Sequence, residues 1–309
     1  MGSSLEINLV WAVLIFFSVY MVIFSFLIHL LEPITPKIVS DAFGYGKTTK
    51  PNLSLWVRRI QVPKSSFTHF YIFGVLLFGS LLIFTVKVVL WGYEVPAFLS
   101  DLLDFATFEG RVSNTSPEAI LMVVTLMNLQ CWRRLYECLY VNVDTGSKMN
   151  ILHYIVGIAH YSCCFLGYIS EAPGFAQHRQ SSIVTWIHIL PDLFKVSLVQ
   201  WACVGLFFWA WRHQLKAHQI FADLKKKNSS HSVPYGDWFQ FVSCPHYTAE
   251  ILIYLSLAVI CGWSHGTAWL IFAWVLINQI IAGLMSHWWY RDNFHNYPSS
   301  RRAVIPFLI

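Results

Sequence analysis

Charged and hydrogen-bonding residues interrupt stretches of this chain that are otherwise apolar enough to lie in a membrane. The clearest case is NLQCWRRLYECLYV, residues 128–141. On a helix, Gln130, Arg134 and Glu137 fall on one face. Arg133 also reaches Glu137, at a spacing of four residues. Charges at membrane depth are costly unless they face a cavity or a partner. Two interpretations are open: arginines that reach the cytosolic interface with a carboxylate counter-ion, or an anion site in which a guanidinium binds phosphate oxygens.

The C-terminal residues 286–309 read SHWWYRDNFHNYPSSRRAVIPFLI. A stop-transfer signal needs only a few Lys or Arg after the last apolar turn. This tail adds histidines, asparagines and many aromatic rings, so we expect it to do more than end a span. Small and polar residues on the preceding helix form a stripe that runs towards it: Gln279, Gly283, Ser286, His287 and Tyr290.

Histidines occur in other apolar runs. His246 and Glu250 are one helical turn apart. His153 and His160 each precede a tyrosine and share one helical face. Because no third type of metal ligand stands near them, we interpret these two histidines as structural or substrate-lining residues and predict no metal site.

The composition identifies a membrane protein. The chain has 309 residues, of which 56% are hydrophobic, 17% aromatic and only 12% charged, with a net charge of +5. These values exclude a soluble domain with an ordinary surface. Nucleic-acid binding has no support either, because the basic residues lie in loops and do not form a run with interleaved aromatic residues.

Seven apolar runs are long enough to cross a bilayer, which requires about 20 helical residues. We find no internal repeat, and the chain reads as a single domain of residues 1–309. The predicted spans lie near 8–31, 68–91, 117–141, 150–170, 190–211, 245–262 and 266–290.

The distribution of positive charge predicts an orientation. The segments 32–67, 142–149 and 212–244, together with the tail, hold fifteen of the 21 Lys and Arg residues. By the positive-inside rule these segments and the C-terminus face the cytosol. The cytosolic ends thus gather Arg, Lys, Tyr, Trp, His and Asn side chains, which suit a phosphorylated cofactor with an aromatic ring. The chain contains no G-x-G-x-x-G after a strand and no P-loop, so a dinucleotide would have to bind among the helices.

Several motifs carry a resemblance to a known family. The tail, the block VPYGDWFQFVSCPHYTAEILIY (233–254) and the helix RRLYECLYV (133–141) resemble signatures of the steroid 5α-reductase family of membrane NADPH-dependent reductases. YGKTTK (45–50), VPKSSFTHFYI (62–72) and the Asp-Trp-Phe that begins at Asp237 are most similar to its polyprenol reductase branch. The resemblance covers nearly all of residues 45–309.

The resemblance implies an all-α fold, an integral membrane bundle of about seven transmembrane helices. NADPH would enter from the cytosolic side and a long polyisoprenoid lipid from the bilayer. It further implies a place in the endoplasmic reticulum membrane, on the route to dolichol for protein N-glycosylation. The cofactor contacts that it implies are Arg134, Glu137, Pro234, Gly236, His246, Glu250, Tyr290, Tyr297 and Arg302. The segment HQLKAH adds His213, Gln214 and His218.

The sequence also departs from the family pattern. Gln130 and Cys131 stand where the family has His-Tyr, so the tyrosine that faces the substrate carbonyl in steroid reductases is missing at this position. His246 replaces an Asn, and Ala249 replaces a Gly. The proton donor must therefore come from elsewhere.

The chemistry of hydride addition points to the substrate. A hydride attacks an alkene carbon only if a conjugated group accepts the charge, and an acid must stabilise that group. An aldehyde meets this need and an allylic alcohol does not, so we expect a polyprenal in place of the polyprenol. His287, His69 and Tyr71 are the candidate acids, although His69 and Tyr71 also fit an interfacial aromatic belt.

Other interpretations remain. The chain could reduce another enone or enoyl lipid, of the steroid or enoyl-CoA type. A membrane methyltransferase acting on isoprenoids would place similar residues at its cytosolic ends but would bind S-adenosylmethionine. A transporter would need a polar path at the membrane midplane, whereas most polar residues here gather towards one side.

Overall fold

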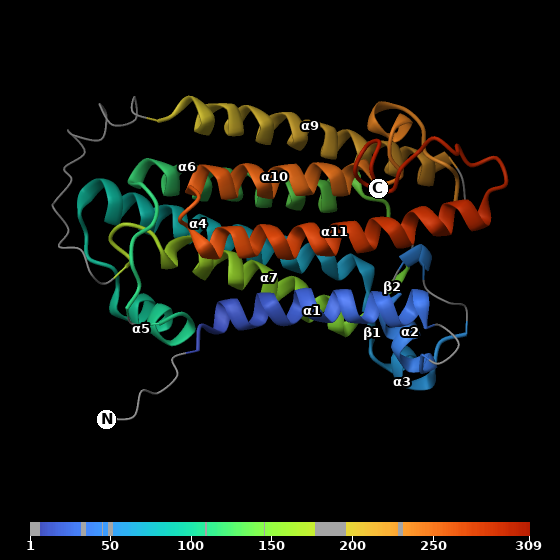
Figure 1. The fold of residues 1–309 in the computed structure, drawn as a ribbon, viewed down its shortest axis with the longest axis horizontal. Coiled ribbons are helices and arrows are strands. Elements are labelled where there is room, and N and C mark those ends of the chain that lie inside the picture. The colour runs from blue at the N-terminus through green and yellow to red at the C-terminus, as the bar shows by residue number, and fades with distance from the viewer. Residues whose placement is uncertain are drawn as a thin grey trace.

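Long apolar helices run side by side through most of the protein (Figure 1). The structure is a computed structural model, and it describes residues 7–31, 35–44, 46–48, 52–108, 110–144, 146–176, 196–227 and 231–309. The long helices are α1 (Leu9–Leu30), α4 (Phe67–Trp91), α6 (Pro117–Tyr136), α7 (Ile151–Ser170), α9 (Leu198–Lys227), α10 (Pro245–Cys261) and α11 (Gly266–Asn293). A π-helical turn, Glu137–Val141, continues α6.

Shorter elements lie mainly at the two ends of the bundle. The end that carries the C-terminal tail also holds α2 (Lys37–Phe43), the 3-10 turn η2 (Gly46–Thr48), α3 (Leu55–Arg59) and the 3-10 turns η3 (Lys64–Ser66) and η6 (Asp237–Gln240). The opposite end holds α5 (Ala97–Ala106).

Helices occupy all seven predicted spans where the structure describes them. The helices α1, α4 with the preceding η3, α7 and α11 are long and apolar enough to cross a membrane, and the protein is therefore a multi-pass membrane protein. The helix α10 is apolar but has only 17 residues. Passage of α6, α9 and α10 through the bilayer stays a prediction.

The fifth predicted span, 190–211, needed the largest correction. Its start lies outside the described residues, and its helix continues to Lys227, so the expected loop from 212 onward was wrong over this stretch. The continuation has strong helix formers such as Ala, Leu, Lys and Gln. It also buries Gln214, Ala217 and Ala222 along one side, so packing supports a helix beyond the apolar segment.

A short antiparallel strand pair modifies the all-α expectation. Strand β1 (Gln61–Pro63) pairs with β2 (Lys148–Asn150), with Val62 opposite Met149. The side chain of Asn150 then caps α7 by accepting a hydrogen bond from the backbone N–H of Leu152, 2.9 Å away. Two segments that were both predicted to face the cytosol thus meet at one end of the bundle.

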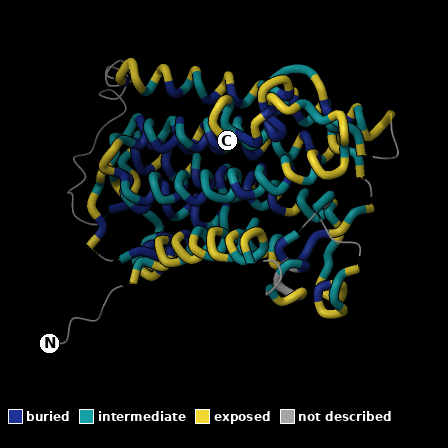
Figure 2. The backbone as a smooth tube through the Cα atoms, turned by 45° about the vertical axis from the view of Figure 1, so that its right-hand side comes forward, coloured by how far each residue is buried: buried dark blue, intermediate teal, exposed yellow. Residues whose placement is uncertain are grey.

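The packing leaves polar atoms inside and apolar side chains outside. The helix α10 packs between α9 and α11, and α4 packs against α6 and α7. Exposed positions follow one side of α1 along its length (Figure 2), among them Phe16, Val19, Ile23 and Phe26. An apolar surface of this extent is typical of contact with lipid.

At the end opposite the tail, the carboxylate of Glu171 holds the start of α11. It accepts hydrogen bonds from the backbone N–H groups of Gly266 (3.2 Å) and Thr267 (2.8 Å). It also accepts one from the amide of Asn114, at 2.8 Å. Burial raises the pKa of this carboxyl, but hydrogen bonds from His265, Asn114 and Thr267 outweigh that effect and hold the pKa at about 2.

We expect Glu171→Gln to destabilise the protein at neutral pH, because an amide nitrogen would then face backbone N–H groups. The depressed pKa means that the contribution of Glu171 is fully present above the unfolded pKa and is lost as the pH falls towards 2. Thermal unfolding in detergent should give a midpoint about 2–6 °C below wild type at pH 7. The difference should shrink below about pH 4. Glu118→Gln, at the same end of the bundle, is the control. Equal midpoints for wild type and Glu171→Gln at pH 7 would contradict the assignment.

Candidate active site

The C-terminal tail folds back onto the start of α10. The backbone N–H of Ser243 donates to the carbonyl of Arg302 at 2.8 Å, and that of Cys244 donates to the carbonyl of Ala303 at 3.1 Å. Val304 is fully buried against Gly283 of α11, where any Cβ would collide with its side chain. The small residue in the polar stripe of α11 is therefore the place where the tail docks.

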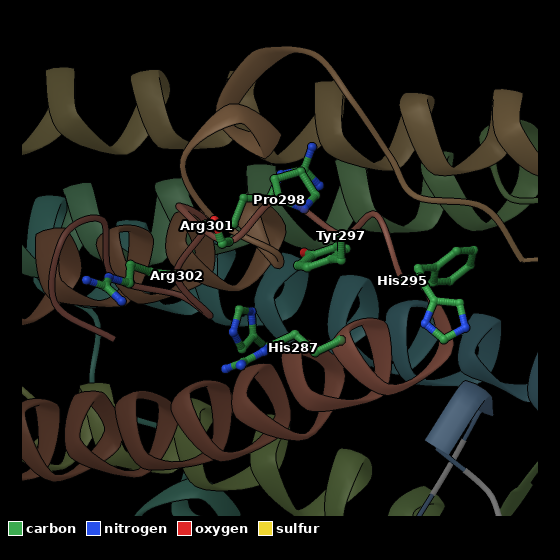
Figure 3. Close-up of a pocket in the computed structure, with 9 residues that line it drawn as sticks. His287, His295, Tyr297, Pro298, Arg301 and Arg302 are labelled. Carbon is green, nitrogen blue, oxygen red and sulfur yellow. The ribbon is translucent and has the colours of Figure 1, made fainter.

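A pocket of about 320 Å³ lies between this tail and the end of α11 (Figure 3). Behind its lining, the buried Ser243 has its Oγ 2.6 Å from His287 Nδ1 and 2.6 Å from the hydroxyl of Tyr297. The rings of Tyr290 and Tyr297 are stacked, with centroids 5.4 Å apart and planes 6° from parallel. The lining residues are His287, Arg291, Phe294, His295, Tyr297, Pro298, Ser299, Arg301 and Arg302.

The two adjacent arginines of the tail, Arg301 and Arg302, differ in burial and in their contacts. The Arg301 side chain is buried, and its guanidinium lies over the rings of Tyr235 and Tyr297, 4.6 Å and 5.3 Å from their centroids. Its Nη1 has no hydrogen-bond partner within the described part of the chain. Arg302, the predicted contact, is exposed at the pocket rim, while its backbone pairs with Val242. Sequence reasoning missed Arg301, because neighbouring arginines give no sign of which one turns inward.

Lys47 is a second residue that the residue-by-residue reasoning missed. It lies on η2, and its Nζ is 3.6 Å from the centroid of the Tyr290 ring and 5.4 Å from that of Trp289. Burial lowers the pKa of Lys47 to about 8. The signal in the sequence is the YGKTTK motif (45–50), which contains Lys47. The pocket end of the bundle thus gathers several cations beside stacked aromatic rings.

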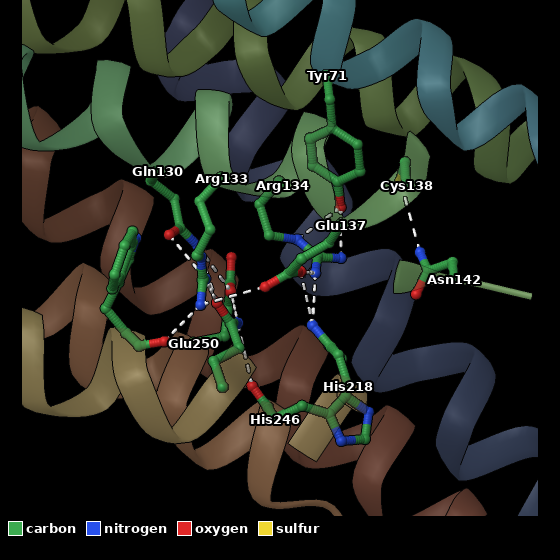
Figure 4. A network of polar contacts seen from close by, with 12 residues as sticks. Tyr71, Gln130, Arg133, Arg134, Glu137, Cys138, Asn142, His218, His246 and Glu250 are labelled. Carbon is green, nitrogen blue, oxygen red and sulfur yellow. Dashed lines mark hydrogen bonds and ion pairs between the residues drawn. The ribbon is translucent and has the colours of Figure 1, made fainter. Parts of the chain in front are cut away.

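A buried polar cluster joins α4, α6, α9 and α10 (Figure 4). The hydroxyl oxygen of Tyr71 accepts two hydrogen bonds from Arg134, from Nε at 3.1 Å and from Nη2 at 2.8 Å. The third nitrogen of Arg134 forms an ion pair with Glu137. His218 Nδ1 lies 2.7 Å from the same carboxylate, which is completely buried.

The second half of the cluster surrounds Arg133. Its guanidinium donates to the side-chain oxygen of Gln130 at 2.9 Å, and also to the side-chain oxygen of Gln214. Gln214 in turn donates to the carboxylate of Glu250. The side chains of Arg133 and Arg134 therefore contact other helices of the bundle, and Glu137 is their counter-ion.

The remaining predicted residues divide into two groups. His246 belongs with the cluster, since its ring packs against those of His218 and Phe221, 5.6 Å and 5.1 Å between centroids. Its Nδ1 has no partner among the described residues. His213 lies apart, with Nδ1 2.9 Å from the Asp237 carboxylate and its ring stacked on Trp238.

Pro234 and Gly236 lie in the loop before η6. Gly236 has a φ of +95°, a conformation that favours glycine and starts the turn. The guanidinium of Arg301 lies over the ring of Tyr235, which stands between these two residues in the sequence. This loop therefore contacts the C-terminal tail.

The three candidate acids have separate surroundings. Tyr71 lies in the buried cluster, and His287 lies in the tail pocket. His69 is exposed, and its ring meets that of Tyr154 edge-on at 6.1 Å. Tyr71 is the candidate whose hydroxyl receives hydrogen bonds from a guanidinium, that of Arg134, whereas His287 shares its pocket with Arg291, Arg301 and Arg302.

Comparisons with known proteins give a consistent result. A family model described as 3-oxo-5-alpha-steroid 4-dehydrogenase matches residues 148–309. A protein of Xenopus tropicalis named Polyprenal reductase is 34% identical over 285 residues, 88% of each chain. Proteins of the same name from Homo sapiens (33% identical, 92% of each chain) and Caenorhabditis elegans (34% identical, 91% of this chain and 90% of the relative) are also similar.

Proposed function

The chain belongs to the 3-oxo-5-alpha-steroid 4-dehydrogenase family, and we propose that it saturates the α-isoprene double bond of a polyprenal. One observation carries this proposal beyond the likeness of sequence. The Tyr71 hydroxyl accepts two hydrogen bonds from the partly buried guanidinium of Arg134, which leaves its own proton free to be donated. Such a hydroxyl is suited to hold a substrate oxygen that becomes negative during the reaction.

The proposed cofactor is NADPH, which supplies a hydride when bound. The pocket end of the bundle fits such a molecule. Arg301 has a guanidinium nitrogen with no partner among the described residues and Arg302 lines the rim, so both can bind phosphate oxygens. The stacked rings of Tyr290 and Tyr297 offer an aromatic face. In the buried cluster, His246 Nδ1 is a further group open to a ligand.

The residues of the buried cluster have distinct roles in this proposal. Tyr71 donates a hydrogen bond to the aldehyde oxygen, and Arg134 stabilises the charge that develops there. Glu137 and His218 hold Arg134 in position. We place the isoprenoid chain of the substrate among the apolar helices, which it enters from the bilayer. The protein lies in the endoplasmic reticulum membrane with its C-terminus on the cytosolic side. The product of the reaction lies on the route to dolichol.

The test of this function uses the two lipids separately. Purified protein with NADPH should saturate the α-isoprene unit of a polyprenal and act negligibly on the matching polyprenol, since only the aldehyde can accept the charge. No other dehydrogenase is present, and product mass is followed with time. Robust turnover of the alcohol alone would defeat the aldehyde hypothesis. Failure of both lipids would favour the methyltransferase or transporter interpretations.

Lys47 gives the proposed site a pH dependence. Burial lowers its pKa to about 8, so in the free protein its charge is lost as the pH rises through that value. We expect NADPH affinity, measured by fluorescence titration, to fall by about 10-fold between pH 7 and 9. Lys47→Arg should remove most of this fall, because a guanidinium stays charged. The Lys47→Met variant should bind NADPH weakly at both pH 7 and pH 9. A wild-type affinity that is constant across this range would exclude Lys47 from the site.

A further inference from the structure

Tyr161 is a buried tyrosine next to the proposed acid. It lies on α7 and is 8% exposed. Its ring meets that of Tyr71 edge-on, with centroids 6.1 Å apart and planes at 75°. It also lies against Gly74 of α4, where an added Cβ would be 3.2 Å from Tyr161 Cε1 and 3.1 Å from Cys131 Sγ. Three helices thus meet at this ring.

The hydroxyl of Tyr161 differs from those of its neighbours. Tyr71 is held by Arg134, and the Tyr254 hydroxyl lies 2.8 Å from His160 Nε2. The Tyr161 hydroxyl has no hydrogen bond to any residue that the structure describes. A tyrosine hydroxyl without a partner in the protein keeps its proton available for a bound molecule. Arg134 and Glu250 are near enough to interact with it electrostatically.

The proposed reaction needs a second proton-transfer step. When hydride adds to the β-carbon, the electrons of the double bond move to the aldehyde oxygen and an enolate forms. The reaction is complete only when the α-carbon gains a proton and the carbonyl reforms. A hydrogen bond from Tyr71 to the oxygen stabilises the enolate but leaves the carbon unprotonated.

We propose that Tyr161 is the acid that protonates the α-carbon. The proposal rests on the function proposed above. The Tyr161 O–H bond breaks, and the electrons of the enolate form the new C–H bond. The tyrosinate then recovers a proton from water. Because the two rings are neighbours, one hydroxyl can serve the oxygen and the other the carbon two bonds away, and Gly74 allows α4 to lie close against the Tyr161 ring.

The first measurement uses the wild-type protein in deuterated water. With NADPH and polyprenal, deuterium should enter the α-carbon on one face only, because a fixed side chain delivers it. The position and the face are read by mass spectrometry and NMR of the product. Deuterium on both faces in equal amounts would overturn the proposal, because the proton would then come from free water. This readout does not depend on the folding of any variant.

The second measurement uses Tyr161→Phe. We expect kcat to fall by about 10²-fold. The solvent isotope effect on kcat should rise and the facial preference should be lost, while NADPH affinity stays at the wild-type value. Tyr168→Phe, at a buried tyrosine seven residues further along the same helix, should change none of these. Wild-type kcat and facial preference in Tyr161→Phe would overturn the proposal and leave the proposed function intact. Absence of polyprenal reduction by the wild-type protein would instead refute the function itself.

Discussion

Tyr71→Phe is expected to lower kcat for polyprenal by about 10²–10³-fold, the usual loss when one hydrogen bond to a developing oxyanion is removed. The substitution deletes only the hydroxyl that Arg134 holds at 2.8 Å and 3.1 Å. The aromatic ring and its contact with Tyr161 remain. NADPH affinity should therefore change little, and the loss should appear in kcat more than in KM.

Two variants serve as controls for this result. Tyr154→Phe removes a tyrosine hydroxyl that lies 3.4 Å from His69 Nδ1, away from Tyr71. This variant should leave kcat unchanged. His69→Ala tests the exposed candidate acid and should also have little effect. If His69→Ala or His287→Ala lost activity while Tyr71→Phe kept it, the acid would have to be reassigned to that histidine.

The fold was largely readable from the sequence, because helix length and apolarity are local properties. The seven predicted ranges contain helices, and the two segments that form β1 and β2 were placed on one side of the membrane. The end of α9 was not readable in this way. Apolarity stops near Trp211, but the helix continues because Gln214, Ala217 and Ala222 pack against the rest of the bundle. Tertiary packing extends the helix beyond the segment that hydropathy detects.

The candidate site was predictable in composition but less so in geometry. Periodicity correctly gathered Gln130, Arg134 and Glu137, since they share one face of one helix. It could not show that Gln214 would link Arg133 to Glu250, because those contacts come from two other helices. It also could not choose between Arg301 and Arg302, since the turn of the tail decides which side chain is buried. The likeness to the family indicated which residues belong to the site. The structure showed which side chains each of them contacts.

The cluster is close to charge balance, and this determines how it responds to mutation. Arg133 and Arg134 face the carboxylates of Glu137 and Glu250 through direct contacts or through Gln214. Charges so deeply buried are tolerated because each has a partner. Removal of one partner therefore affects both stability and chemistry, and the two effects must be separated by experiment.

Arg134→Ala is expected to reduce activity by about 10³-fold or more, because it removes the charge that stabilises the oxygen and the group that positions Tyr71. It should also destabilise the fold by about 3–5 kcal/mol, since the completely buried Glu137 loses its closest partner. The double variant Arg134→Ala with Glu137→Ala removes both charges, so it should recover much of the unfolding midpoint in detergent and none of the activity. Arg134→Lys keeps the charge but not the two-nitrogen contact with Tyr71, and should retain the fold with partial activity. Recovery of activity in the double variant would mean that Arg134 serves only to neutralise Glu137, and the assignment of Tyr71 and Arg134 as a catalytic pair would then be wrong.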